Sequence, residues 1–558
     1  MKHTQGKRMW RLPARETVGV EGLLAQVAQQ RGLPSAEVGV RPYTDINDGQ
    51  LLLDVTKAVD HLSSLIGTDH EVVVYGDYDI DGLTATTLVV DVLTRLGIRV
   101  RPYIPDRFEE GYGLNTTALE ALAAESVHTV ITVDCGSTAI GPIARAHELG
   151  LKMIITDHHL VGEKEPDGLV AHINPQRKGN AYPQPGIAGV GVAYHVMRAL
   201  QQKHQDLIPE GQEKWWLDLV ALGTVCDVVP LVGDNRIFTQ YGLKVLARTR
   251  RPGLLALAEV SKISLDQIQA SDLGFRFGPR LNASGRLEHA RLSLDVLLAT
   301  DIAEARRHAT SLDTMNTKRQ QLVAKILDQA REQALAQSEH AFLVVFDEDW
   351  SHGVAGLIAA RLAEEFMKPA AVLQVEGDVA KGSVRTFGGI HVLEAMRTMD
   401  ALLMKYGGHA AAAGLTLATS DIPALQKGLD EALQTIPDEH WENTRTADVW
   451  LSPDHVSQEG LAAVRQFEPT GRGHEPIIFV VEADVTSLRW VGADQTHAQV
   501  QLAFHNVVHR AMAFQALRLW PWLESGIKIR CYLQLVGNVW QGVERPDLHV
   551  VDMEEIKE

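Results

Sequence analysis

Cysteine, long apolar runs and low-complexity tracts are scarce in this chain of 558 residues. Its three cysteines include no Cys-x-x-Cys pair and are too few for a disulfide framework, which favours a reducing, cytoplasmic location. No apolar run reaches the roughly 18 residues needed to cross a bilayer, so we expect no membrane association. Residues 1–15 are basic but lack an apolar core, which argues against a secretory signal. The sequence contains no Walker loop and no recognisable Ser-His-Asp arrangement, so it gives no support for NTP-driven chemistry or acyl transfer.

Positive charge is also in short supply, since the formal net charge is −18 at pH 7. This balance argues against adhesion to nucleic acid over the whole surface, and any polyanionic substrate would need locally concentrated positive charge or bound cations. The hydrophobic content of 45% and the charged content of 22% are ordinary for a globular protein. The length predicts two to four domains.

Apolar runs alternate with helical patterns between residues 50 and 230. This order predicts βαβ units on a parallel sheet, because parallel strands need crossover connections. The expected strands are Glu71–Tyr75, Ile98–Ile104, Thr129–Val133, Leu151–Thr156 and Leu169–Ile173, and the expected helices are Leu83–Leu96, Thr116–Ala124 and Thr138–Leu149.

A helical pattern without Gly or Pro runs from Asp301 to Glu339. One helix of that length would span on the order of 55 Å, which suits a connector between domains. Two helices broken near Thr314–Thr317 are the alternative.

A second α/β pattern begins at Ala341–Phe346, and short β-like runs dominate after residue 446 and predict a small barrel. The fold class is therefore α/β multidomain. We expect an N-terminal leader at 1–45 with a helix near Glu21–Gln30, a parallel-sheet domain at 46–300, a connecting helix at 301–340, a smaller α/β domain at 341–440 and a barrel at 446–558.

Three alternating carboxylates, Asp77, Asp79 and Asp81, follow the first expected strand and precede Gly82. Carboxylate oxygens suit hard cations such as Mg²⁺ and Mn²⁺. An EF-hand loop would place Glu six residues after the glycine, but Leu88 stands there, so that interpretation fails. A solvated acidic turn is the remaining alternative.

Further acidic and histidine side chains follow later strands and segments. They are Asp134, the run Asp157-His158-His159, and Asp227. Ligands bind beyond the carboxyl ends of strands in open parallel sheets, so we expect these side chains to converge. The set suffices for two metal ions, which points to hydrolysis of phosphate esters. Structural histidines and a helix-capping or loop role for Asp227 are the alternatives.

Two further segments are candidates for contacts with phosphate. Arg276, Arg280, Arg286 and Arg291 form a basic stretch, and the Gly-Pro pair and Gly285 within it predict a loop rather than a surface helix. The run Gly407–Gly414 would let backbone N–H groups approach a phosphate at a helix N-terminus, although close packing also explains it. The aromatic residues of the barrel could stack bases, but we expect most of them in its core.

The motif order resembles that of the DHH phosphoesterases. The resemblance rests on Tyr75–Gly82, Val133–Gly136, Asp157–His159 and Asp227–Pro230, and it extends from about residue 45 to the end. The additional motifs Gly278–Arg286, Ser351–Val354 and Gly407–His409 narrow it to the single-stranded-DNA-specific exonucleases of that family. One departure is His474, where many relatives have Asn.

The resemblance implies a DHH domain, a DHH-associated domain joined by a long helix, and a C-terminal OB-fold. It implies 5′→3′ degradation of single-stranded DNA to nucleotide monophosphates in repair and recombination, with two Mn²⁺ or Mg²⁺ ions. A single-stranded-DNA-binding protein and a helicase are the expected partners of a monomeric enzyme.

The resemblance also implies roles for individual residues. Asp79, Asp81, Asp134, His158 and Asp227 would be metal ligands, with Asp134 bridging and Asp77 as a further participant. His159 would contact the scissile phosphate or protonate the leaving oxygen, beside Asp134 and Arg280 as catalytic residues. The expected substrate contacts are Arg280, Asn282, Arg286, Ser351, His352, Ser383, Arg385, Gly408 and His409.

Two other functions compete with this one. A small-molecule phosphoesterase of the same family, acting on pyrophosphate or short oligonucleotides, would need neither the barrel nor the long connector. An inactive DNA-binding scaffold would have no need for the complete set of acidic and histidine ligands.

Overall fold

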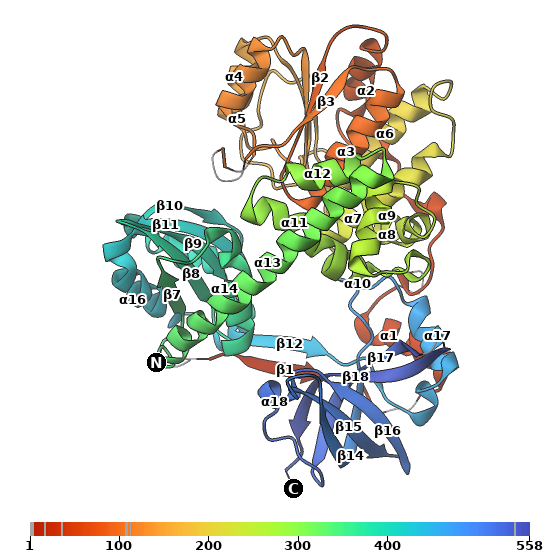
Figure 1. Cartoon of the computed structure of the whole chain (residues 1–558), viewed down its shortest axis with the longest axis vertical. Helices are drawn as coiled ribbons and strands as arrows, with labels where there is room; N and C mark the ends of the chain where they lie inside the picture. Colours follow the sequence, from red (N-terminus) through yellow and green to blue (C-terminus); the bar gives the residue numbers. More distant parts are fainter. Residues whose placement is uncertain are drawn as a thin grey trace. The chain divides into compact units, whose positions relative to one another are not determined.

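The structure is a computed structural model that describes residues 5–15, 18–34, 37–106, 110–111, 113–540 and 543–557 (Figure 1). Its contacts divide the chain into two units. Unit 1 comprises 1–15 and 317–447, and unit 2 comprises 16–316 and 448–558. Within the described residues, no helix combines the length and the apolarity that crossing a membrane requires.

A parallel sheet forms the centre of the first part of unit 2, with strand order β3-β2-β4-β5-β6. Its strands are β2 (Val72–Gly76), β3 (Val100–Tyr103), β4 (Thr129–Val133), β5 (Lys152–Thr156) and β6 (Ala171–Ile173). Strands β2 and β4 are buried along their whole length, which explains their continuous apolar runs. The predicted parallel sheet is confirmed, and its strand ends shift by one or two residues.

Helices cover both faces of this sheet (Figure 1). On one face, α4 (Thr116–Ala124) and α5 (Ile140–Glu148) pack against Tyr75, Val130 and Ile155. On the other face, α2 (Val55–Ser64), α3 (Ile80–Arg95) and α6 (Gly189–Lys203) pack against Val74 and Ile131. The helices that follow are α7 (Leu217–Cys226), α8 (Gly233–Leu246), α9 (Pro252–Ser261), α10 (Ala270–Asp272), α11 (Gly278–Leu287) and α12 (Arg291–Leu298).

One uninterrupted helix, α13 (Ile302–Leu335), continues from unit 2 into unit 1. Its 34 residues correspond to about 51 Å. Ala305, Ala309 and Leu312 are buried against unit 2, whereas Val323 and Ile326 are buried in unit 1. The prediction of a single connecting helix is confirmed, and the two-helix alternative is wrong.

Unit 1 contains a mixed sheet with strand order β10-β11-β9-β8-β7. Its elements are β7 (Leu343–Asp347), α14 (His352–Phe366), β8 (Ala370–Glu376), β9 (Val379–Arg385), α15 (Val392–Arg397), β10 (Leu403–Gly408), β11 (Ala412–Ala418) and α16 (Ile422–Leu433). A separate parallel pair joins β1 (Lys7–Arg11) to β12 (Glu442–Thr446), so the start of the chain adds a strand to this unit.

A closed barrel forms the C-terminal part of unit 2, because β14 pairs with both β15 and β17. Its elements are β13 (Val449–Trp450), α17 (Gln458–Gln466), β14 (Phe479–Val491), β15 (His497–Phe504), β16 (Val507–Ala513), α18 (Ala516–Leu519), β17 (Lys528–Trp540) and β18 (Val543–Glu555). The helix α1 (Leu23–Arg31) packs Leu23 and Val27 into the barrel core. The predicted barrel is confirmed.

Two local predictions are wrong. The basic stretch is helical, since a π-turn at Leu273–Phe277 leads into α11, and Pro279 fits because a first-turn residue needs no N–H partner. The run Gly407–Gly414 opens no helix but forms the β10–β11 turn and its flanking strand residues. Among the barrel aromatics, Phe479, Phe504, Trp520 and Tyr532 are buried, Trp490 is half-buried, and Phe514 and Trp522 are exposed.

Candidate metal centre

The first acidic segment lies in a tight turn between β2 and α3. Asp79 caps the helix, since its Oδ1 accepts a hydrogen bond from the Gly82 amide at 3.1 Å. A Cβ atom at Gly82 would lie 2.5 Å from the carbonyl oxygen of Asp77, so only glycine allows this approach. The turn therefore brings the Asp77 and Asp79 carboxylates close together at the end of the strand.

Asp81 is buried in the first turn of α3 and points toward the N-terminus of α6. Its two oxygens accept hydrogen bonds from the amides of Gly189 at 2.6 Å and Val190 at 2.8 Å. A helix N-terminus stabilises negative charge, which explains how these backbone amides can hold the buried carboxylate. A Cβ atom at Gly189 would lie 2.6 Å from Asp134 Oδ1, so this glycine also keeps space beside Asp134.

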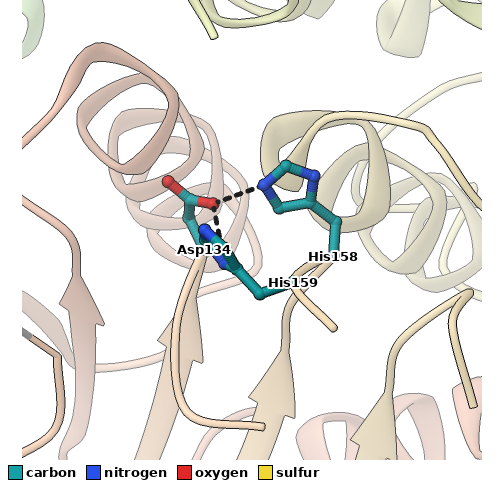
Figure 2. A group of neighbouring side chains, drawn as sticks. All are labelled: Asp134, His158 and His159. Atoms are coloured by element: carbon teal, nitrogen blue, oxygen red, sulfur yellow. Dashed lines mark ion pairs between the residues drawn. The ribbon is translucent and has the colours of Figure 1, made fainter. Parts of the chain in front are cut away.

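Asp134 and the histidine pair follow neighbouring strands, β4 and β5, as the sequence predicted (Figure 2). His158 Nε2 lies 3.1 Å from Asp134 Oδ1, 3.7 Å from Asp227 Oδ2 and 3.8 Å from Asp81 Oδ2. His159 Nδ1 lies 3.9 Å from the same Asp134 oxygen. Asp134 has φ of +62°, a strained backbone conformation of the kind that clusters at functional sites.

Three overlapping groups of ligand atoms meet here, each with all its atoms within 4.8 Å of one another. The groups are Asp134, His158 and His159; Asp81, His158 and Asp227; and Asp77, Asp79 and Asp134. All predicted metal ligands and His159 thus lie in one place. Asp134 and His158 each belong to two groups, which is the pattern expected around two adjacent cations.

Two buried atoms at the centre of this cluster lack hydrogen-bond partners among the described residues. They are Asp134 Oδ1 and His158 Nε2, which approach one another without hydrogen-bond geometry. His158 is hydrogen-bonded to the backbone of Ile187, and by elimination its Nδ1–H is the donor. This leaves the lone pair of Nε2 directed at the cluster, as in metal-binding histidines. Carboxylate and imidazole donors of this kind suit Mn²⁺ or Mg²⁺.

The electrostatics of the cluster reflect crowded carboxylates. Burial, followed by repulsion from Asp81 and Asp79, raises the pKa of Asp134 well above its usual range. Burial and Asp79 raise the pKa of Asp81 to about 7, and burial and Asp81 raise that of Asp227 to about 9. Burial lowers the pKa of His158 to about 4, so this imidazole is neutral at pH 7. Raised carboxyl pKa values of this kind reflect acidic groups crowded in a buried site, and a bound cation would favour their ionised forms.

Asp157 has a different role from its acidic neighbours, although the sequence analysis grouped it with the converging side chains. It is buried and accepts hydrogen bonds from the amides of Ser137, His158 and His159 and from His159 Nδ1 at 2.8 Å. Burial opposes its charge, but the hydrogen bond and charge of His159 and these amides hold the pKa of Asp157 well below its usual value. Burial also opposes the charge of His159, yet Asp157 raises the pKa of His159 to about 9.

The predicted phosphate contacts of α11 lie beside this cluster. A Cβ atom at Gly278 would lie 3.1 Å from Cys226 Sγ, and one at Gly285 would lie 3.5 Å from the Tyr78 carbonyl. The helix therefore extends along both acidic segments and carries Arg280, Asn282 and Arg286, all half-buried. Arg280 Nε pairs with Asp313 Oδ1 at 2.8 Å, a partner on α13 that the sequence did not indicate.

The remaining predicted substrate residues belong to unit 1 and form a group of their own. Ser383 and Arg385 lie on β9, opposite Gly414 and Ala412 of β11, which connect to Gly408 and His409 in the turn. A Cβ atom at Gly356 of α14 would lie 2.8 Å from Arg385 Nη2, so the helix that starts at His352 packs against the same strand. Ser351 is the N-cap of that helix.

Family models match three regions of the chain. The model for "DHH family, N-terminal domain" matches residues 71–224, "DHHA1 domain" matches 339–435, and "RecJ OB domain" matches 447–552. The single-stranded-DNA-specific exonuclease RecJ of Escherichia coli is 34% identical over 529 residues, which cover 91% of each chain. The chain belongs to the RecJ family. RecJ of Bacillus subtilis is 32% identical over 547 residues, which cover 96% of this chain and 68% of that protein.

The fold agrees with solved RecJ structures. The crystal structure of RecJ from Thermus thermophilus in complex with Mn²⁺ has a TM-score of 0.80 and 26% identity, covering 99% of this chain and 80% of that one. A second structure, of exonuclease RecJ bound to manganese, is 33% identical with a TM-score of 0.61 and covers 70% of this chain. The predicted three-part architecture with a connecting helix is confirmed.

Proposed function

We propose that this RecJ-family chain is a metal-dependent exonuclease that degrades single-stranded DNA. The observation that carries the proposal is the convergence of three ligand groups on Asp134 and His158. Its relatives are named single-stranded-DNA-specific exonucleases, which supports the substrate class. The 5′→3′ direction, the release of nucleotide monophosphates and the role in repair and recombination follow from the family resemblance.

Two Mn²⁺ or Mg²⁺ ions are the proposed cofactors, since related RecJ structures are complexes with these ions. Asp77, Asp79, Asp81, Asp134, His158 and Asp227 would hold them, with Asp134 between the two. Bound divalent cations would supply a water of lowered pKa and would neutralise phosphate charge. The unsatisfied oxygen of Asp134 and nitrogen of His158 favour this assignment over a structural role.

His159 is the proposed general acid or phosphate contact of the site. Asp157 holds its imidazole by a hydrogen bond at 2.8 Å and favours its charged form at neutral pH. A charged imidazole beside the cluster can pair with a phosphate oxygen or deliver its proton to the leaving oxygen. Asp157 would act through His159 rather than on the substrate.

Further contacts with the strand are proposed for the basic helix and for unit 1. Arg280, Asn282 and Arg286 would bind phosphate oxygens, because guanidinium groups form paired hydrogen bonds with them. Ser351, His352, Ser383, Arg385, Gly408 and His409 would contact the substrate from unit 1. The domain limits 46–300, 301–340, 341–440 and 446–558 belong to this proposal, with residues 1–45 as the preceding segment.

The proposal also covers the protein partners and the cellular location of this chain. We infer a monomer that works with a single-stranded-DNA-binding protein and a helicase, since an exonuclease of this specificity needs exposed single strands. A cytoplasmic location fits the three free cysteines, because reducing compartments keep thiols free.

The test measures Mn²⁺- or Mg²⁺-dependent degradation of labelled DNA by the purified full chain. The substrates are single strands blocked at the 5′ end, single strands blocked at the 3′ end, fully paired duplex, and pyrophosphate. The proposal expects activity to be lost only with the 5′-blocked strand and the duplex. Rapid turnover of pyrophosphate with intact DNA would instead identify a small-molecule phosphoesterase, and inactivity on every substrate would favour a scaffold.

A further inference from the structure

The segment that follows Asp227 has a strained backbone. Asp227 is the C-cap residue of α7, and the next residue, Val228, has φ of +61° although it is β-branched. Branched residues rarely adopt this conformation, which persists only where the surroundings enforce it. Val228 is 55% exposed, so burial of its own side chain does not explain the strain. Another element must therefore hold this segment.

That element is the loop Pro469–His474, which precedes the first long strand of the barrel and is called here the barrel-entry loop. The Leu231 amide donates to the Arg472 carbonyl oxygen at 2.7 Å, and Arg472 Nη1 donates to the Val228 carbonyl oxygen at 3.3 Å. Gly471 and Gly473 allow the close approach, since a Cβ atom at either would lie near Leu231 or Pro230, at 2.7 Å and 3.1 Å. These contacts join distant parts of the sequence, since Val228 and Arg472 are 244 residues apart.

The barrel-entry loop is itself anchored to the DHH part of unit 2. The buried guanidinium of Arg236 on α8 donates to the carbonyl oxygens of Phe467 at 3.0 Å and Pro469 at 2.7 Å. His474 is buried, stacks on the Phe467 ring at 3.9 Å and makes a hydrogen bond to the Phe467 carbonyl oxygen at 3.0 Å. The position of Arg472 is therefore fixed by contacts on both sides of it.

The Arg472 guanidinium is exposed and has no carboxylate within ion-pair distance in the described part of the chain. Its single described side-chain hydrogen bond is the one to the Val228 carbonyl, directly beside Asp227. Arg280, in contrast, already pairs with Asp313. Arg472 thus presents unpaired positive charge at the rim of an acidic site.

We propose that Arg472 binds a phosphate of the DNA strand beside the metal cluster, so that the barrel region contributes a substrate-binding residue to the catalytic centre. The inference rests on the proposed exonuclease function and adds a contact that neither the sequence motifs nor the comparisons indicate. A guanidinium with free N–H groups is suited to paired hydrogen bonds with phosphate oxygens. Since the contact lies at the reacting phosphate, it would act on short and long strands alike.

The experiment compares full-length wild type, Arg472→Ala, Arg472→Lys and a matched control, Arg250→Ala. Arg250 is also exposed, but it lies just after the C-terminal end of α8, whereas Asp227 lies before the N-terminal end of that helix. The 14 residues of α8 separate its two ends by about 21 Å. Steady-state kcat and KM are measured on a long single strand and on a dinucleotide, at several salt concentrations. Mn²⁺ affinity and Tm are measured in parallel.

The proposal expects Arg472→Ala to lower kcat/KM about 10- to 100-fold on both substrates, the range of a charge-assisted hydrogen bond. Arg472→Lys should recover part of the loss, and Arg250→Ala should match wild type. The slope of log kcat/KM against log salt on the long strand should become shallower by about 0.7, as for one lost phosphate contact. Mn²⁺ affinity and Tm should be unchanged, because the backbone contact to Leu231 remains.

Other outcomes separate the two proposals. The role of Arg472 is overturned if wild type is active and the kcat/KM of Arg472→Ala lies within twofold of the wild-type value. It is also overturned if the salt dependence of kcat/KM is the same in the variant and in wild type. If Arg472→Ala has a lower Tm and unfolding accounts for its whole loss of activity, the phosphate-binding role is also overturned. Arg472 would then only stabilise the fold. A wild type inactive on both DNA substrates with Mn²⁺ bound overturns the proposed function itself, and the role of Arg472 with it.

Discussion

Asp448 and the acidic cluster are both buried in unit 2, but they differ in whether a basic side chain supplies their counter-charge. Asp448, at the entry to the barrel, is fully buried, and both its oxygens accept from Arg31, at 2.7 Å and 2.6 Å. The Ile478 amide supplies a further hydrogen bond at 2.8 Å. At the end of the parallel sheet, Asp81 and Asp134 are equally buried, yet neither has a Lys or Arg partner in the described residues.

The difference distinguishes a structural carboxylate from a ligand. A buried charge is costly unless it is paired, so a structural site supplies its own counter-charge, as Arg31 does. The acidic cluster carries the cost of mutual repulsion, visible in the raised pKa of Asp134, Asp81 and Asp227. A bound external cation would offset that cost. The four predictions below test this contrast, from the largest expected effect to the smallest.

Asp134→Asn should abolish catalysis without harming the fold. The loss of the shared ligand should remove about 5 kcal/mol of transition-state stabilisation, which is roughly a 10⁴-fold fall in kcat. In the presence of EDTA the variant should be at least as stable as wild type, because one repelling carboxylate is gone. Single-turnover degradation and thermal unfolding check both points. A lower Tm in EDTA would mean that Asp134 is structural, against the contrast drawn here.

Asp448→Asn should lower stability and leave catalysis nearly unchanged, the reverse of Asp134→Asn. Removing the carboxylate leaves the half-buried Arg31 guanidinium with uncharged partners, among them the carbonyl oxygens of Glu475 and Pro476, so the free energy of unfolding should fall by about 3 kcal/mol. Activity per folded molecule should change little at temperatures well below Tm. Denaturant titration and activity at 20 °C check this, and unchanged stability would show that the Arg31 pair contributes nothing.

Mn²⁺ should stabilise the protein only through the acidic cluster. At 100 times its dissociation constant the ion should add about 2.7 kcal/mol to the free energy of unfolding, by mass action. Asp134→Asn should lose most of this gain, and Asp448→Asn should keep it even though its own stability is lower. The readout is the shift of Tm with Mn²⁺ against EDTA. An equal shift in wild type and Asp134→Asn would place the ion elsewhere.

Two buried histidines of unit 2 also differ in their surroundings. His158 and His474 are both neutral at pH 7 because burial lowers the pKa of each, to about 4 and about 3 respectively. Each forms a hydrogen bond to a backbone group, of Ile187 and Phe467 respectively, but of the two only His158 belongs to the acidic cluster. Since the pKa of His474 is depressed by folding, its contribution to stability is complete above pH about 6.5 and falls as the pH drops toward 3. Between pH 7 and 5 this loss should be about 1–2 kcal/mol.

His474→Asn should remove that part of the acid sensitivity, since an amide can donate to the same carbonyl without titrating. Stability curves in denaturant at pH 7, 6 and 5 provide the measurement, with exposed His505→Asn as the control. Parallel curves for wild type and His474→Asn would show that other groups cause the acid sensitivity.

The amino-acid sequence alone was enough to predict the parallel sheet, the connecting helix, the barrel and the side chains that gather in the acidic cluster. These follow from local rules: apolar runs form the strands, and polar residues directly after parallel strands meet at one edge of the sheet. The sequence therefore places Asp77, Asp134 and His158 together. The absence of Gly and Pro likewise indicated that α13 is continuous.

Only the tertiary structure decided which neighbours each side chain has. The sequence could not show that Asp157 orients His159 instead of joining the cluster, that Asp313 pairs with Arg280, or that Arg472 lies beside Asp227. The sequence also led to the wrong prediction of a loop at α11, where the Gly-Pro pair is accommodated in a helix that begins after a π-turn. The contacts of Arg280 and Arg472 depend on packing between residues 33 and 244 positions apart, and local propensity carries no information about that packing.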